Sequence, residues 1–152
     1  MMKALPQEIE HAFKERTYPG DNEIVQEATG DPGYEGNRLA IHFKGVNWQD
    51  LDLKTIISSG TLDPATFIYL LTPAGFAYYM PAFLLWSLDV DSAPGLAETL
   101  MFSLTPSVGK DSEDWEWKQE HMTIFNQQER DAIKHAYDYI LPQLEEFPLV
   151  KN

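Results

Sequence analysis

The fold of this chain is decided by one uncharged stretch near its centre, Leu71-Thr72-Pro73-Ala74-Gly75-Phe76-Ala77-Tyr78-Tyr79-Met80-Pro81-Ala82-Phe83-Leu84-Leu85-Trp86-Ser87-Leu88. Thr72 can cap a helix with its side-chain oxygen, and Pro73 suits the first helical position, where its missing N–H is not needed. The helix predicted over Thr72–Leu88 is apolar on nearly every side, which is typical of a helix in the centre of a core. Pro81 removes one backbone hydrogen bond and predicts a kink.

The adjacent tyrosines Tyr78 and Tyr79 form a candidate pocket beside this predicted kink. Pro81 has no N–H to give to the carbonyl of Ala77, so a tyrosine hydroxyl or a water must satisfy that oxygen. One interpretation is a ligand pocket at the kink, and the other is a buried tyrosine that fills the gap. We prefer the second, because buried polar groups must find partners in any case.

Working outward, amphipathic spacing and cap residues predict a series of shorter helices. They lie over Pro6–Arg16, from Asp21 or Asn22 toward Ala28, over Tyr34–Lys44, from Asn47 or Asp52 through Ile57, from Asp63-Pro64, over Leu96–Leu104, and from Asn126 to Pro142. Tyr34–Lys44 also alternates as a strand would, but Gly45 resembles a helix C-terminal cap and favours helix. Thr105–Met122 is polar and is predicted to be irregular.

Together these elements predict an all-α or mainly α fold, a compact bundle of about six or seven short helices around the Pro-kinked apolar helix Thr72–Leu88. The 152 residues fit one globular domain, and no repeat or linker divides residues 1–152.

Composition narrows the function. The chain has no cysteine, which rules out thiolate zinc sites and cysteine nucleophiles. A net charge of -13 argues against binding nucleic acid or an anionic membrane surface. Residues 64–88 carry no charge, yet Pro64, Pro73 and Pro81 favour consecutive buried helices over one membrane span. No signal peptide opens the chain, so we expect a cytoplasmic protein.

No arrangement of residues predicts a metal, a cofactor or a reaction. Glu8 and His11 share one helix face, but a di-iron bundle needs two such pairs and further glutamates. There is no Gly-x-Ser-x-Gly elbow and no phosphate-binding glycine loop. We therefore expect no cofactor, and the missing motifs favour a non-catalytic protein over an enzyme.

Three segments resemble an uncharacterised family of small bacterial proteins. They are Phe43-Lys44-Gly45-Val46-Asn47-Trp48-Gln49-Asp50-Leu51, the central Leu71–Leu84 segment with its Leu-Thr-Pro-x-x-Phe-x-Tyr-Tyr-x-Pro-Ala pattern, and Phe125-Asn126-Gln127-Gln128-Glu129. The chain departs from the family pattern at Ala74, where an acidic residue is usual. The resemblance implies a compact helical bacterial domain and implies no activity.

The candidate interface is the acidic segment, which we define as residues 111–120. It places two tryptophans among five acids, and its candidate contact residues are Asp111, Glu113, Asp114, Trp115, Glu116 and Trp117. Tryptophan often anchors interfaces, and clustered carboxylates steer basic partners. Alternatively, Trp115 or Trp117 folds back onto the helices and the acids only keep the segment solvated.

From these features we expect an acidic protein-binding module of immunity or inhibitor type whose partner is a basic protein, a toxin or an enzyme. The alternative is a small-molecule-binding protein or an enzyme without familiar motifs, with its pocket near Tyr78, Tyr79 and Pro81.

Overall fold

The computed structural model describes residues 4–26, 33–58, 60, 63–64, 67–91 and 94–145. The helices are α1 (Leu5–Phe13), α2 (Gly33–Phe43), α3 (Leu53–Ser58), α4 (Pro73–Ser87), α5 (Pro94–Leu104), α6 (Trp115–Met122) and α7 (Gln127–Glu145), with 3-10 helices at Trp48–Asp50 and Phe67–Leu70. Within these described ranges, β pairing is confined to an isolated bridge between Val25 and Leu71. The predicted all-α fold is confirmed.

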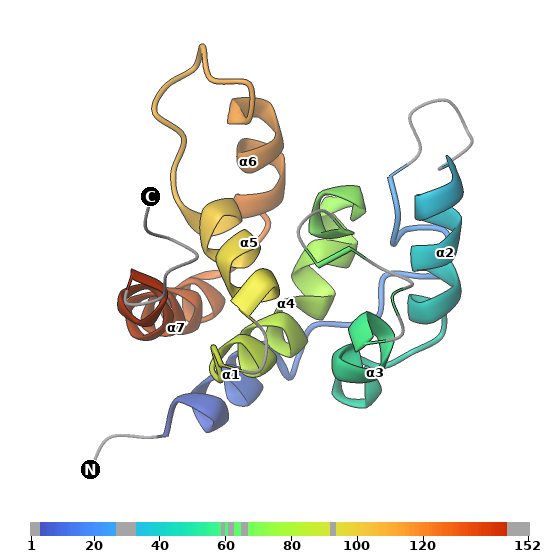
Figure 1. Cartoon of the computed structure of the whole chain (residues 1–152), viewed down its shortest axis with the longest axis horizontal. Coiled ribbons are helices and arrows are strands. Elements are labelled where there is room, and N and C mark those ends of the chain that lie inside the picture. Colours follow the sequence, from blue (N-terminus) through green and yellow to red (C-terminus); the bar gives the residue numbers. More distant parts are fainter. Residues whose placement is uncertain are drawn as a thin grey trace.

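Helix α4 lies in the middle of the fold, as its sequence predicts. Figure 1 shows α2 and α3 on one side of α4, and α5, α6 and α7 on the other. Its buried side chains belong to one apolar cluster with residues from all of these helices, and Phe76, Tyr79, Met80, Phe83 and Leu84 are fully buried. The helix is also continuous through Pro81. A helix buried on all sides needs no polar face, which explains its uncharged sequence.

The start of α4 is fixed by its cap and by a close backbone contact. The Gly75 N–H donates to the Thr72 Oγ1 at 2.9 Å, which confirms the predicted cap. The Thr72 N–H in turn donates to the Ile24 carbonyl at 2.9 Å. A Cβ atom at position 75 would lie only 2.6 Å from that same Ile24 oxygen. Position 75 therefore requires glycine because two backbone segments touch there.

The short helix predicted from Asp21 or Asn22 toward Ala28 is wrong within the described residues. Residues 21–26 form a turn and then the bridge at Val25, and Ala28 lies outside the described residues. The Gln26 N–H donates to the Leu70 carbonyl at 2.8 Å. Backbone partners near the start of α4 thus replace the hydrogen bonds that a local helix would make.

Other helix boundaries differ from the prediction for identifiable reasons. The helix expected from Asn47 or Asp52 is two elements, because Asn47 caps the 3-10 helix and Asp52 accepts a hydrogen bond from the Thr55 N–H. The helix expected after Asp63-Pro64 appears, in the described residues, as the 3-10 helix Phe67–Leu70.

Pro142 does not end α7, which continues to Glu145. The side chain of Leu144 beyond it is 2% exposed. Core packing therefore outweighs the single backbone hydrogen bond that the proline removes.

The region expected to be irregular, Thr105–Met122, contains helix α6 over its last eight residues. The buried side chains of α6 are Lys118 and His121, which are polar residue types. A hydrophobicity pattern therefore gives no signal for this helix.

Finally, among the described residues no helix is long and apolar enough to cross a membrane.

Candidate functional site

The acidic segment is divided between a loop and a helix. Residues 111–114 end the long loop that follows α5, and residues 115–120 belong to α6. In Figure 1 this loop and α6 project together from one end of the molecule, away from α1 and α3. The geometry of the segment depends on how that projection is held.

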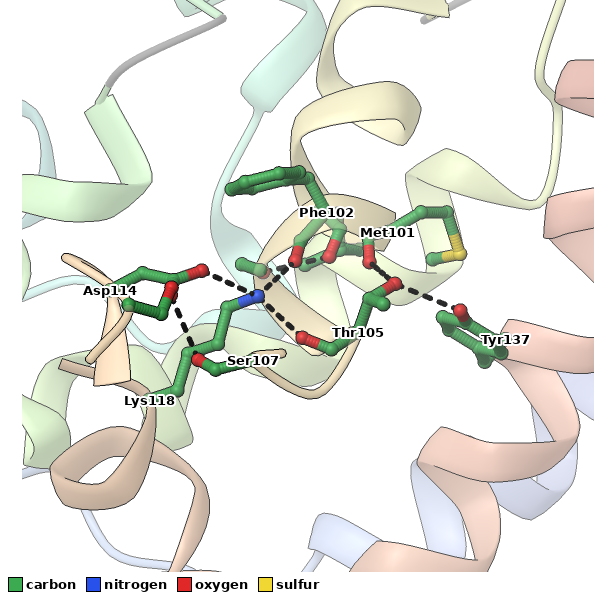
Figure 2. Close-up of polar contacts among 10 residues, drawn as sticks. Met101, Phe102, Thr105, Ser107, Asp114, Lys118 and Tyr137 are labelled. Atoms are coloured by element: carbon green, nitrogen blue, oxygen red, sulfur yellow. Dashed lines mark hydrogen bonds and ion pairs between the residues drawn. The ribbon is translucent and has the colours of Figure 1, made fainter. Parts of the chain in front are cut away.

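A buried lysine holds it. Lys118 is 5% exposed, and Figure 2 shows its ammonium group between α5 and the loop. Its Nζ donates to the Phe102 carbonyl at 2.9 Å and to the Thr105 carbonyl, and it pairs with Asp114 at 3.0 Å. An ammonium group has three donors, and these three oxygens satisfy them all. Lys118 therefore fastens α6 to the end of α5.

Asp114 completes the same network at the start of α6. Its carboxylate accepts hydrogen bonds from the Ser112 hydroxyl and from the Ser107 hydroxyl at 2.9 Å, besides its pair with Lys118. The hydrogen bond from Ser112, then those from Lys118 and Ser107, lower the pKa of Asp114 well below its usual range. Asp114 thus stabilises the segment and is not a free interface carboxylate.

The two tryptophans differ in position. The Trp117 ring stacks on the His121 ring with centroids 3.9 Å apart, and it packs edge-on against Tyr69 at 5.1 Å and Phe76 at 5.3 Å. Trp117 therefore turns inward and joins α6 to α4. Trp115 is half-buried at the start of α6. Of the two aromatic candidates, Trp115 is the one whose ring the structure does not place in such a cluster.

The remaining acids of the segment face solvent. Asp111, Glu113, Glu116 and Glu120 are all exposed. In the part of the chain that the structure describes, none of these four carboxylates makes an ion pair. The charge of Lys118 is thus paired within the segment, and the four other carboxylates of the segment stay exposed.

Tyr78 and Tyr79, the candidate pocket residues, are buried and hydrogen-bonded. The Tyr79 hydroxyl lies 2.7 Å from the carbonyls of both Phe43 and Val46, and burial raises the pKa of this phenol strongly. The Tyr78 hydroxyl accepts a hydrogen bond from the Trp48 N–H at 3.3 Å. The two hydroxyls thus join α4 to the end of α2 and to the residues after it, and neither contact is with the Ala77 carbonyl.

A polar cavity of about 480 Å³ lies among α1, the turn after it, and the starts of α4 and α7. Its wall includes an ion pair in which the Arg16 Nε and Nη2 donate to the Glu129 carboxylate at 2.7 and 2.6 Å. Glu129 also accepts from the Asn126 N–H, and Asn126 accepts from the Glu129 N–H, which confirms the predicted cap of α7. No local pattern predicts the pairing of Glu129 with Arg16, because the two residues are 113 positions apart in the chain. Ala74 lines this cavity too.

Glu8 and His11 are the acid and histidine that the sequence places on one face of α1. The Glu8 carboxylate contacts His135 of α7, and it lies 2.5 Å from the His135 Nδ1. Among the described residues, no group of three or more His, Asp or Glu side chains could hold a metal ion.

Comparison with known proteins adds the family. A family model described as "Family of unknown function (DUF6714)" matches residues 1–146. The chain belongs to this family. The expected membership of an uncharacterised family is thus confirmed. No curated protein and no solved structure matches the chain.

Proposed function

We propose that this protein is a non-catalytic, cytosolic bacterial binding module of immunity or inhibitor type, which occupies a basic protein partner through the acidic segment. The observation that carries the proposal is the internal use of Lys118. Because the Lys118 ammonium group is bonded to Phe102, Thr105 and Asp114, it is not left to pair with the exposed carboxylates of the segment.

The support is electrostatic and geometric. A chain with net charge -13 attracts basic proteins over long range, and locally clustered charge orients the encounter. The network at Asp114 fixes the loop before α6, so the backbone that carries Glu113 and Glu116 loses little freedom on binding. Trp115 is the aromatic side chain best placed to add apolar contact beside them. Trp117 acts in the fold instead.

The alternative function, a small molecule bound near Tyr78 and Tyr79, receives less support. The hydroxyls of both tyrosines are occupied by backbone groups, and the side chains are 3% and 0% exposed. A ligand at that position would have to displace hydrogen bonds that hold the 3-10 helix at Trp48 against α4.

The experiment is a pull-down from the native host with mass spectrometry, followed by binding kinetics with the captured partner at two salt concentrations. Glu113→Gln with Glu116→Gln should slow association several-fold at low salt, and the difference should fade at about 0.15 M, where screening acts beyond roughly 8 Å. A matched double variant, Glu10→Gln with Glu98→Gln, removes two exposed charges elsewhere and should associate as the unmodified protein does.

A second arm tests anchoring. Trp115→Ala should speed dissociation. If the ring is a buried anchor in the complex, the binding free energy should fall by roughly 2 kcal/mol or more. Each variant must first show an unchanged unfolding midpoint. A captured partner without a basic surface, or wild-type kinetics in both the Glu113/Glu116 and the Trp115 variants, would refute the proposal.

A further inference from the structure

A second hollow, separate from the acidic segment, lies where the end of α5 meets α6 and α7. Its volume is about 330 Å³, near the lower end of the roughly 300–1,000 Å³ that is usual for ligand pockets. It is lined by Leu104, Pro106, Met122, Arg130, Ile133, Lys134 and Tyr137. Most of the lining is apolar, and the two bases come from one helix.

The apolar wall of this hollow is formed by side chains that hydrogen bonds or burial hold in place. The Thr105 hydroxyl donates to the Met101 carbonyl at 2.7 Å and lies 2.8 Å from the Tyr137 hydroxyl, as Figure 2 shows. Since the single Thr105 hydrogen is used on Met101, Tyr137 must be the donor to Thr105. The phenol ring is therefore fixed as one wall. Ile133 is 6% exposed and forms part of the α7 side.

Two cations border the hollow. Arg130 and Lys134 are exposed and lie one turn apart on α7. The Arg130 Nε donates to the Phe125 carbonyl at 3.0 Å, which orients the guanidinium group and leaves its two terminal nitrogens for a ligand. Lys134 pairs with Asp138 at 2.9 Å, but both side chains are more than half exposed, so this surface pair exchanges easily.

Two of the chain's eleven basic residues thus lie beside one apolar hollow, in a protein with 24 acidic residues. A neutral apolar ligand would leave this charge unused, and a cation would be repelled by it. A carboxylate suits it best, because the planar guanidinium group matches a carboxylate with two parallel hydrogen bonds.

We infer that this hollow binds a small organic carboxylate with an apolar tail, its carboxylate on Arg130 and Lys134 and its apolar part against Leu104, Met122, Ile133 and Tyr137. The site is independent of the proposed protein partner, since it uses a different surface and the opposite charge.

The test is titration of the isotopically labelled protein, followed by nuclear magnetic resonance, with three probes of equal chain length: octanoate, 1-octanol and octylammonium. Octanoate should bind saturably, with the largest shifts at the amides of Leu104, Met122 and residues 130–137. Octanol should bind at least about 10-fold more weakly, and octylammonium should not bind at this position, as expected when a charged hydrogen bond is lost.

Variants separate the charge from the apolar wall. Arg130→Gln should weaken the affinity for octanoate about 10-fold or more without changing octanol binding. Lys54 is an exposed lysine on α3, and Lys54→Gln should leave both affinities unchanged. Leu104→Trp should fill the hollow and abolish the binding of both, and its fold is checked by circular dichroism. Equal affinity for octanoate and octanol, octanoate shifts centred elsewhere, or an unaltered octanoate affinity in Arg130→Gln would overturn the inference.

Discussion

Phe83 shows how much one residue of the core contributes to stability. Its side chain is fully buried in α4, and its ring packs edge-on against Phe67 with centroids 5.6 Å apart. It also contacts Phe43 of α2. The residue therefore joins α4 to the elements that precede it.

Phe83→Ala should lower the free energy of unfolding by roughly 3–5 kcal/mol, because it leaves a cavity where a buried aromatic ring was. Urea denaturation followed by circular dichroism measures this change. Tyr139→Ala, at an aromatic side chain that is 53% exposed, serves as the control and should change stability by less than about 1 kcal/mol. A Phe83→Ala variant as stable as the parent would show that α4 is not the centre of the core.

Gly75 allows a second test of stability at the scale of one residue, because its role in the fold is steric. A methyl group there would lie 2.6 Å from the Ile24 carbonyl oxygen, a backbone atom that cannot turn aside. Gly75→Ala should therefore destabilise by roughly 1–3 kcal/mol, the usual cost of overpacking. Gly95→Ala in α5 is the matched control, since its Cβ would meet only the Pro64 side chain at 3.5 Å. That control should be neutral or stabilising by up to about 1 kcal/mol in a helix. Equal effects of the two substitutions would contradict the close approach of α4 to Ile24.

At the scale of one element, α6 combines the inward-facing ring of Trp117 with two buried polar side chains. These are Lys118 and His121, and the His121 ring nitrogens lie 2.8 Å from the carbonyls of Trp117 and Leu71. The start of the helix depends on Asp114, whose carboxylate receives three donors. Stability of this element should therefore depend on pH.

The pKa of Asp114 is lower in the folded protein than in the unfolded chain, so folding favours the carboxylate. Its contribution is complete above the unfolded pKa of about 4 and is lost as the pH falls toward the lower folded value. Asp114→Asn should be less stable than the parent at neutral pH, and the difference should shrink between about pH 5 and about pH 2. Urea unfolding across this range measures it. Glu113→Gln, at an exposed neighbour, should stay within about 0.5 kcal/mol of the parent at neutral pH. A difference between the parent and Asp114→Asn that grew at low pH would contradict the network.

At the scale of the whole molecule, charge opposes the compact state. The chain carries 24 acidic and 11 basic residues, and Arg16 and Lys118 are already used in internal pairs. The exposed acids of the folded protein repel one another.

Sodium chloride should therefore stabilise the protein at neutral pH, because it shortens the range of repulsion from roughly 30 Å at 0.01 M to roughly 8 Å at 0.15 M. The measurement is the urea midpoint at these two salt concentrations, since urea adds no charge of its own. We expect the midpoint to rise with salt. An unchanged or lower midpoint would mean that attractive ion pairs such as Arg16–Glu129 outweigh the repulsion.

The sequence by itself determined the helical class, the cap and burial of α4, and the cap of α7 at Asn126 and Glu129. These features depend on neighbours within about four residues, or on a helix that is apolar on all sides, and both can be seen in the local pattern. It also indicated membership of an uncharacterised family, which the family model over residues 1–146 confirms.

Only the tertiary structure decided the features that depend on distant partners. Helix α6 is held by the Phe102 carbonyl of α5 and by the Leu71 carbonyl, and the turn at residues 21–26 is held by the start of α4. The same holds for the roles of Trp117, which faces the core, and of Tyr79, which bonds to two carbonyls near the end of α2. The physical reason is that a buried polar group takes whichever partner the packing brings to it, and no spacing along the chain records that partner.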